Sequence, residues 1–176
     1  MLVDNADIRQ IRPDDVRRNI GVVMQNPILF SGSIRDNIMM GNPDASDADL
    51  LEAAKQSGVD AFVPMLPGGY DFPLSERGRE LSVGMRQSVA IARALIGKPN
   101  ILLMDEPTAP LDSQAEMNMV ASLDVATKGL TTIFVTHRGA MLQMADKVLA
   151  MDGGRIAAFG PRDDVMKPAP VDVAKA

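Results

Sequence analysis

Apolar residues along this chain occur either in short unbroken runs or at helical spacing, which predicts alternating strands and helices. Residues 20–24 form an apolar run that stops at a Gln-Asn-Pro turn, and we expect them to be a buried strand. Residues 101–104 are entirely apolar and residues 131–136 are rich in β-branched side chains, so both predict further strands. The runs at 147–152 and 155–159 flank a Gly-Gly pair, which predicts a hairpin.

Helices are predicted where apolar residues recur every three or four positions behind a side chain that can cap the helix. Ser46 is such a cap, and the predicted helix has Leu50, Leu51 and Ala54 on one face before Gly58 ends it. Ser82 and Asp112 are further caps. The apolar faces behind these two caps are formed by Met85, Val89, Ala92 and Ile96 and by Ala115, Met119, Leu123 and Ala126.

The order of these elements predicts an α/β fold in one domain, with a parallel sheet flanked by helices. Residues 31–97 carry helical signals and no convincing strand, so we expect a helical lobe inserted into the sheet. The sheet lobe would then comprise residues 1–30 and 98–166. The proline-containing tail, residues 167–176, is expected to be frayed.

Composition excludes several classes of protein. A formal net charge of −5 and a pI near 4.8 give no basic field, so no nucleic-acid partner is expected. The chain has no cysteine, which fits a reducing compartment such as the cytosol. No apolar run approaches the roughly 20 residues that a membrane-spanning helix requires, so we expect the chain not to span a membrane by itself.

Polar side chains follow three of the predicted strands at the edge where functional loops of parallel sheets gather. Asp105 and Glu106 end the apolar run, where Asp105 is placed to hold Mg²⁺ and Glu106 to polarise a water for attack on a γ-phosphate. Gln25 suits contact with Mg²⁺ and water, because its amide both donates and accepts. Each residue alone also has an ordinary structural explanation, since acids commonly end strands and glutamine is common in surface turns.

His137, the chain's one histidine, directly follows the strand at residues 131–136. A lone histidine is more often structural than catalytic. If its strand lies beside residues 101–104, the imidazole would be next to Glu106 and could donate to a γ-phosphate oxygen.

The segment Leu81-Ser82-Val83-Gly84-Met85-Arg86-Gln87 predicts an anion site, because a serine and a glycine at a helix start present a hydroxyl and exposed N–H groups. Taken alone, it is also compatible with a simple capped helix. No window of the sequence matches the phosphate-binding loop G-x-x-x-x-G-K-[ST]. The sequence therefore contains half of a nucleotide site.

In this order, the residues resemble the nucleotide-binding domain of ATP-binding cassette (ABC) transporters over nearly the whole chain. The matching motifs are the Q-loop at Gln25, the signature at residues 81–87, Walker B at residues 101–105 with Glu106, the D-loop ending at Asp112, and the H-loop at His137. Residues 26–38 and 69–78 look like exporters, and most like bacterial type I secretion ATPases.

The resemblance implies that two such domains meet head to tail and enclose ATP and Mg²⁺. Ser82 and Gly84, with Gln87 and Asp112, would contact ATP bound by the partner. Glu106 would be the general base. His137 and Gln25 would contact the γ-phosphate and water, and Gln25 would couple the site to the transmembrane domain of an exporter. The implied location is the cytoplasmic face of the inner membrane.

Several residues depart from the family pattern. Val83 and Met85 replace a glycine and a glutamine of the usual Leu-Ser-Gly-Gly-Gln signature, and a β-branched Val83 restricts the approach of the backbone to phosphate. Weaker closure on ATP follows as a hypothesis. Pro110 removes an N–H from the D-loop. Asn5 stands where the family usually has glycine in a turn, and asparagine tolerates positive φ.

The resemblance places Met1 after the Walker A loop. We therefore expect the carboxyl-terminal portion of an exporter ATPase, inactive by itself. One alternative is a non-catalytic module that supplies its signature to an intact partner. Another is a soluble ABC protein that serves DNA repair or translation, although the acidic balance weighs against it.

Overall fold

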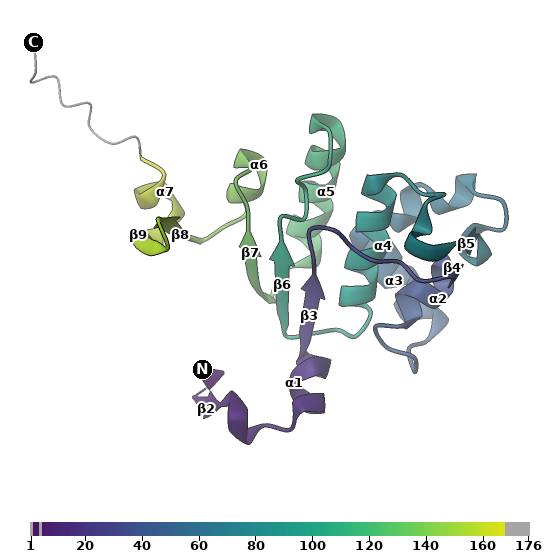
Figure 1. The fold of residues 1–176 in the computed structure, drawn as a ribbon, viewed down its shortest axis with the longest axis horizontal. Helices are drawn as coiled ribbons and strands as arrows, with labels where there is room; N and C mark the ends of the chain where they lie inside the picture. Colours follow the sequence, from purple (N-terminus) through teal and green to yellow (C-terminus); the bar gives the residue numbers. More distant parts are fainter. Residues whose placement is uncertain (1, 4, 168–176) are drawn as a thin grey trace, which may run out of the picture. The chain divides into compact units, whose positions relative to one another are not determined.

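The computed structural model describes residues 2–3 and 5–167 of the chain (Figure 1). The chain forms two compact units, Met1–Thr136 and His137–Ala176, and each is described by itself. The predicted frayed tail lies outside the described residues, apart from Lys167.

The centre of the first unit is a parallel sheet of three strands, β3 (Ile20–Val23), β6 (Ile101–Asp105) and β7 (Thr131–Val135). Their order is β3-β6-β7, so the strand that ends in the two acids lies in the middle (Figure 1). The three predicted strands and the α/β fold class are confirmed.

The sheet buries one face only. Val23, Leu102 and Met104 are at most 3% exposed and belong to the core, whereas Val22 and Ile133 are 54% and 58% exposed. Successive side chains of a strand point to opposite faces, so an apolar run does not by itself show burial on both faces. The prediction of a buried strand at residues 20–24 is therefore right for alternate residues and wrong for the others.

The predicted helix after Ser46 is α3 (Asp47–Ser57). Ser46 and Asp49 form a reciprocal capping box, and Gly58 ends the helix in the left-handed conformation. Leu50 is 1% exposed, but Leu51 is 55% exposed, so Leu51 does not share the buried face.

The caps at Ser82 and Asp112 are confirmed as well. Ser82 begins α4 (Val83–Leu95), and its Oγ accepts the Met85 N–H at 3.2 Å. Asp112 begins α5 (Ser113–Ala126).

Residues 31–97 are mainly helical. They also contain an antiparallel pair of two-residue strands, β4 (Gly32–Ser33) and β5 (Pro73–Leu74), so the expectation that no strand occurs there is wrong in this detail. A division of the chain into a sheet lobe and a helical lobe stays a prediction. The other elements of this stretch are α2 (Ile34–Met39) and the 3₁₀ turns Val59–Ala61, Val63–Met65, Gly69–Asp71 and Glu76–Gly78.

The start of the chain forms a small hairpin of β1 (Leu2–Val3) and β2 (Ala6–Asp7). Asn5, in the turn between them, has φ of 63°, which confirms that asparagine is tolerated there with positive φ. The 3₁₀ turn Ile8–Gln10 and helix α1 (Pro13–Asn19) then lead into β3.

The second unit contains the predicted hairpin. Strands β8 (Lys147–Asp152) and β9 (Arg155–Pro161) pair antiparallel, with a bulge beside Ala150. Helices α6 (Gly139–Leu142) and α7 (Arg162–Val165) complete the described part of this unit.

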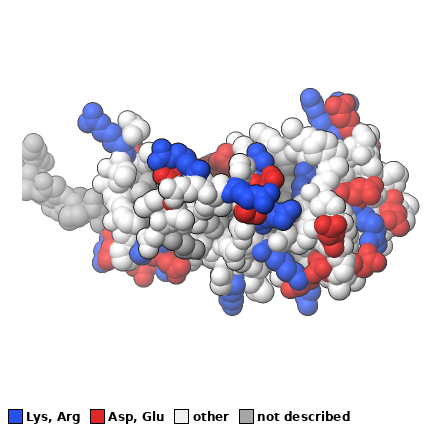
Figure 2. Space-filling model, turned by 90° about the horizontal axis from the view of Figure 1, so that it is seen from below, with Lys and Arg blue, Asp and Glu red and all other residues white. Residues whose placement is uncertain are grey.

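Two surface properties bear on function. Among the described residues, no helix is long and apolar enough to cross a membrane. Figure 2 shows acidic and basic side chains intermixed over the face that it presents.

Helices α2 and α4 meet backbone to backbone near Gly41. A Cβ at this position would lie 1.9 Å from the carbonyl oxygen of Arg93, closer than any real contact. Only glycine permits this approach, so the end of α2 is fixed against the carboxyl-terminal part of α4.

Replacing Gly41 with alanine should lower the free energy of unfolding by about 2 kcal/mol, because the obstacle is a backbone carbonyl that moves only with α4. Urea unfolding of the purified chain measures the loss. The control is Gly139→Ala, since a methyl group there meets no atom within 4 Å. Equal stability of the two variants would contradict the close approach.

Candidate functional site

The carboxyl ends of β3 and β6 lie side by side, because Val23 is in register with Met104. Gln25 is two residues beyond β3 and is exposed, and Asp105 is the last residue of β6. The structure thus brings the end of the Gln25 strand next to the strand that ends in Asp105 and Glu106, as predicted.

Glu106 has an unusual backbone conformation. Its φ is 45°, in the left-handed region that residues other than glycine rarely adopt. Its N–H donates to the carbonyl of Val135 at 2.9 Å, which ties the turn to the end of β7. Such conformations cost of order 1–3 kcal/mol. Asn5, Arg77 and Lys98 also have positive φ, so this feature supports the choice of Glu106 only together with its place at the end of the central strand.

His137 is the first residue of the second unit. In the sequence it follows the end of β7 by two residues, which agrees with the predicted strand. The position of its imidazole beside Glu106 stays a prediction.

The signature segment is the amino-terminal turn of a 13-residue helix. Ser82 is exposed, and because its Oγ accepts a backbone N–H, its own O–H can still donate to a ligand. Val83 is 41% exposed at the first helical position. The first-turn N–H groups and the helix dipole make this end of α4 suitable for an anion.

Gly84 also has a packing role that the sequence did not reveal. A Cβ at Gly84 would lie 3.0 Å from the Cδ2 atom of Leu111, so the signature helix contacts the D-loop of the same chain closely. Leu111 is 7% exposed and therefore belongs to the core. The absence of a side chain at Gly84 serves this contact in addition to any approach to phosphate.

Gln87 lies one turn further into α4 and is completely buried. Its amide nitrogen and oxygen have no hydrogen-bond partner among the described residues. A direct contact between Gln87 and a nucleotide stays a prediction.

The D-loop is held at both ends. The Oδ1 atom of Asp112 accepts the N–H of Ala115 at 2.8 Å, and Asp112 itself is exposed. At the other end, the buried Thr108 hydroxyl donates to Oε1 of Glu116 at 3.1 Å. The Thr108–Glu116 pair was not predicted from the sequence, because the two residues meet only after α5 has formed.

The donor set near Asp105 fits a magnesium ion that arrives with phosphate. Among the residues that the structure describes, no group of three or more His, Cys, Asp or Glu side chains could hold a metal ion. Mg²⁺ is commonly bound by one or two carboxylates together with substrate phosphates and water. Asp105, with the amide of Gln25, supplies ligands of the right chemistry.

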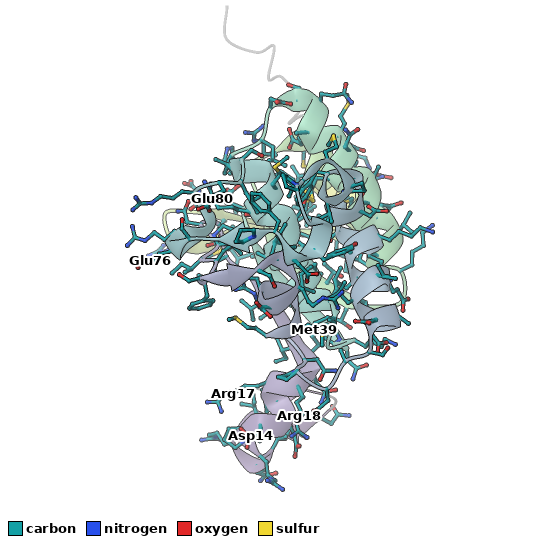
Figure 3. The ribbon with its side chains drawn as sticks, turned by 90° about the vertical axis from the view of Figure 1, so that its right-hand side faces the viewer. Asp14, Arg17, Arg18, Met39, Glu76 and Glu80 are labelled. Carbon is teal, nitrogen blue, oxygen red and sulfur yellow. The ribbon has the colours of Figure 1, made fainter. Side chains whose placement is uncertain are left out.

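The basic residues of α1 do not lie at the sheet edge that carries Asp105. Figure 3 shows Asp14, Arg17 and Arg18 together on the helix that precedes β3, and Arg17 donates to Asp14 at 3.2 Å. Helix α1 leads into the amino end of β3, whereas Gln25 follows the carboxyl end of β3. They are therefore not candidates for phosphate contact at the Asp105 edge.

Comparison with known proteins agrees with these motifs. Residues 1–109 match the sequence family described as ABC transporter. The chain is 44% identical over 166 residues to Multidrug resistance protein homolog 65 of Drosophila melanogaster, which covers 94% of this chain and 13% of that protein. It is 40% identical to the Putative ABC transporter ATP-binding protein exp8 of Streptococcus pneumoniae, over 94% of this chain and 28% of that protein.

A solved structure is similar as well. The structure of a bacterial Atm1-family ABC exporter with ATP bound has a TM-score of 0.85 and 38% sequence identity to this chain. The similarity covers 93% of this chain and 29% of the exporter chain. This chain thus spans less than a third of the length of these three relatives.

The contact between Gly84 and Leu111 predicts a conditional effect on stability. Gly84→Ala should cost about 1 kcal/mol, because a leucine methyl group has to move. With Leu111→Val present, the same change should cost nothing or stabilise, since alanine favours helix over glycine by about 1 kcal/mol. Urea unfolding of the parent protein, the two single variants and the double variant measures this double-mutant cycle. An equal cost of Gly84→Ala in both backgrounds would exclude the contact.

Proposed function

The chain belongs to the ABC transporter family. From this premise we propose that it provides two parts of an ABC exporter ATPase: the sheet edge with Asp105 and Glu106, where ATP is hydrolysed, and the signature helix α4. The observation that supports the proposal most strongly is the central position of β6, which ends in Asp105 and the left-handed Glu106 beside the strand of Gln25. Strained backbone conformations cluster at active sites, and one of the four among the described residues coincides with a carboxylate on this edge.

Glu106 is proposed as the general base. Its carboxylate accepts a proton from water while the water oxygen bonds to the γ-phosphorus and the bond to the bridging oxygen of ADP breaks. His137 donates a hydrogen bond to a γ-phosphate oxygen, and Gln25 orients the water. Asp105 and Gln25 would hold Mg²⁺, which would neutralise phosphate charge when bound.

The signature is proposed to act on ATP held by a second nucleotide-binding domain in a head-to-tail dimer. Ser82 offers a hydroxyl donor, and the helix start at Gly84 offers backbone N–H groups to the γ-phosphate. Asp112 of the D-loop completes the proposed contact surface, whereas Gln87, a further contact implied by the resemblance, is completely buried in this chain. The proposal is supported by the exposed position of Ser82 at the positive end of α4.

The partner of this ATPase is proposed to be the transmembrane domain of an exporter, at the cytoplasmic face of the inner membrane. The names of the relatives, which include multidrug resistance proteins and an Atm1-family exporter, support export as the process. The narrower assignment to type I secretion depends on residues 26–38 and 69–78 and stays a prediction.

Glu106→Gln tests the role of the general base. In the protein as it occurs in its cell, the variant should lose at least 100-fold in steady-state ATP hydrolysis, because general-base catalysis is worth 10²–10⁴-fold. ATP binding, measured by calorimetry, should be unchanged. Glu52→Gln on the surface of α3 is the control and should hydrolyse ATP normally.

The same experiment separates the alternative function. If Glu106→Gln keeps full activity in a complex with an intact ATPase partner while Ser82→Arg abolishes it, the chain is a non-catalytic module. Loss of activity in Glu106→Gln with retained ATP binding supports hydrolysis by this chain.

Val83→Gly tests whether the altered signature weakens closure on ATP. In a Glu106→Gln background, the change should tighten ATP-dependent dimerisation several-fold, because it lets the backbone approach phosphate more closely. Analytical ultracentrifugation with and without Mg-ATP measures the dimer. Val125→Gly, at an exposed valine of a different helix, α5, is the control. Weaker dimerisation of Val83→Gly than of the parent protein would contradict the hypothesis.

A further inference from the structure

The segment that follows Gln25 has no regular secondary structure, yet its backbone groups are hydrogen-bonded at three successive residues. The Ile28 carbonyl accepts from Arg93 at 3.0 Å, and the Leu29 carbonyl accepts the Arg77 N–H at 3.0 Å. The N–H and C=O groups of Phe30 both bond to Asn37 at 2.8 Å. Two side chains and one backbone N–H from outside the segment therefore determine its path.

Asn37 is one source of these contacts. This residue of α2 is completely buried, and its amide uses both of its donors and its acceptor oxygen. The nitrogen donates to the carbonyls of Phe30 and Ser33, at 2.8 and 3.0 Å. The oxygen accepts from the Phe30 N–H at 2.8 Å and from the Arg93 guanidinium at 3.0 Å. A satisfied buried amide of this kind has essentially one orientation.

Arg93 is the second source, and it comes from α4. Besides its bonds to Ile28 and to the Asn37 amide oxygen, its Nε donates to the Asn37 carbonyl at 2.9 Å. The guanidinium also lies 5.6 Å from the centre of the Phe30 ring, within range of a cation–π interaction. The group is half-buried, and this partial burial lowers its pKa. A fork of N–H donors that meets three oxygens is specific to arginine.

The backbone of Arg93 is itself fixed. Its carbonyl is the group that Gly41 approaches so closely, so α2 and α4 hold this residue from the main chain as well. Arg93 lies in the last turn of α4, and Ser82 and Gly84 lie at the start of the same helix. Helix α4 is thus the rigid connection between the signature and residues 28–30.

We propose that Arg93 is a positioning residue that joins residues 28–30 to helix α4, so that Gln25 moves together with the signature helix. The inference depends on the proposed function, because it assigns a consequence for hydrolysis to the roles of Gln25 and Ser82. Closure of the signature on a phosphate at one site would then shift Gln25 in the other site of the dimer. Arg93 acts through Gln25 and touches no substrate.

Hydrogen exchange in the protein as it occurs in its cell, once purified, tests the network itself. Arg93→Met keeps the length of the side chain and removes its donors, so the Phe30 amide should exchange at least tenfold faster. The Ala115 amide, capped by Asp112, should keep its rate. Lys98→Met, which removes an exposed cation just after α4, is the control and should change neither amide. Unchanged protection of Phe30, or faster exchange at both amides alike, would overturn the proposal.

If Arg93→Met does not fold, Arg93→Lys replaces it in this test. Lysine keeps the charge but cannot present the fork of donors. Faster exchange of the Phe30 amide supports the proposal, and unchanged exchange contradicts it.

Kinetics of the protein as it occurs in its cell test the coupling to Gln25. Arg93→Met should lower kcat about tenfold and leave KM for ATP within about twofold, because the change misplaces the Gln25 amide that orients the water and leaves the other nucleotide contacts in place. In a Gln25→Ala background, Arg93→Met should cause no further loss. Equal losses in both backgrounds would show that Arg93 does not act through Gln25. Full hydrolysis by Glu106→Gln would refute the proposed function and leave the exchange result intact.

Discussion

The parallel pairing of β6 between β3 and β7 is the constraint on which the rest of the structure depends. It sets Asp105 and Glu106 at the centre of one sheet edge, and the bond from the Glu106 N–H to Val135 continues the pairing one residue beyond the strand. That bond accompanies a left-handed backbone at a carboxylate, a conformation that costs free energy. The sheet therefore stabilises the turn that carries Glu106.

Helix α4 gives this edge its second connection. At its start, Ser82 caps the helix and leaves a hydroxyl donor at the positive end of the dipole. At its end, Gly41 and Arg93 fix the helix against α2 and against the segment after Gln25. The signature and the Q-loop are far apart in the sequence, and in our proposal this helix connects them so that they move together.

Much of this arrangement could be predicted, because strands and caps are local properties. Short apolar runs identified the three parallel strands, and Ser46, Ser82 and Asp112 identified the helix starts. What failed depends on contacts between distant residues. The exposed Leu51, the pair β4–β5 and the left-handed Glu106 each follow from packing that no local pattern records. Arg93 did carry a signal, as a single cation in the apolar stretch 89–95.

The central claim is that one chain places a base and its assisting side chains on one triphosphate and its signature on another. The most direct measurement is an experimental structure of the natural protein with Mg-ATP in a Glu106→Gln background. The account predicts residue 106 and Gln25 within about 3 Å of a water in line with the γ-phosphate, with His137 on a γ-phosphate oxygen. Ser82 would contact the second nucleotide. A structure with residue 106 and His137 on opposite edges of the sheet would contradict the account.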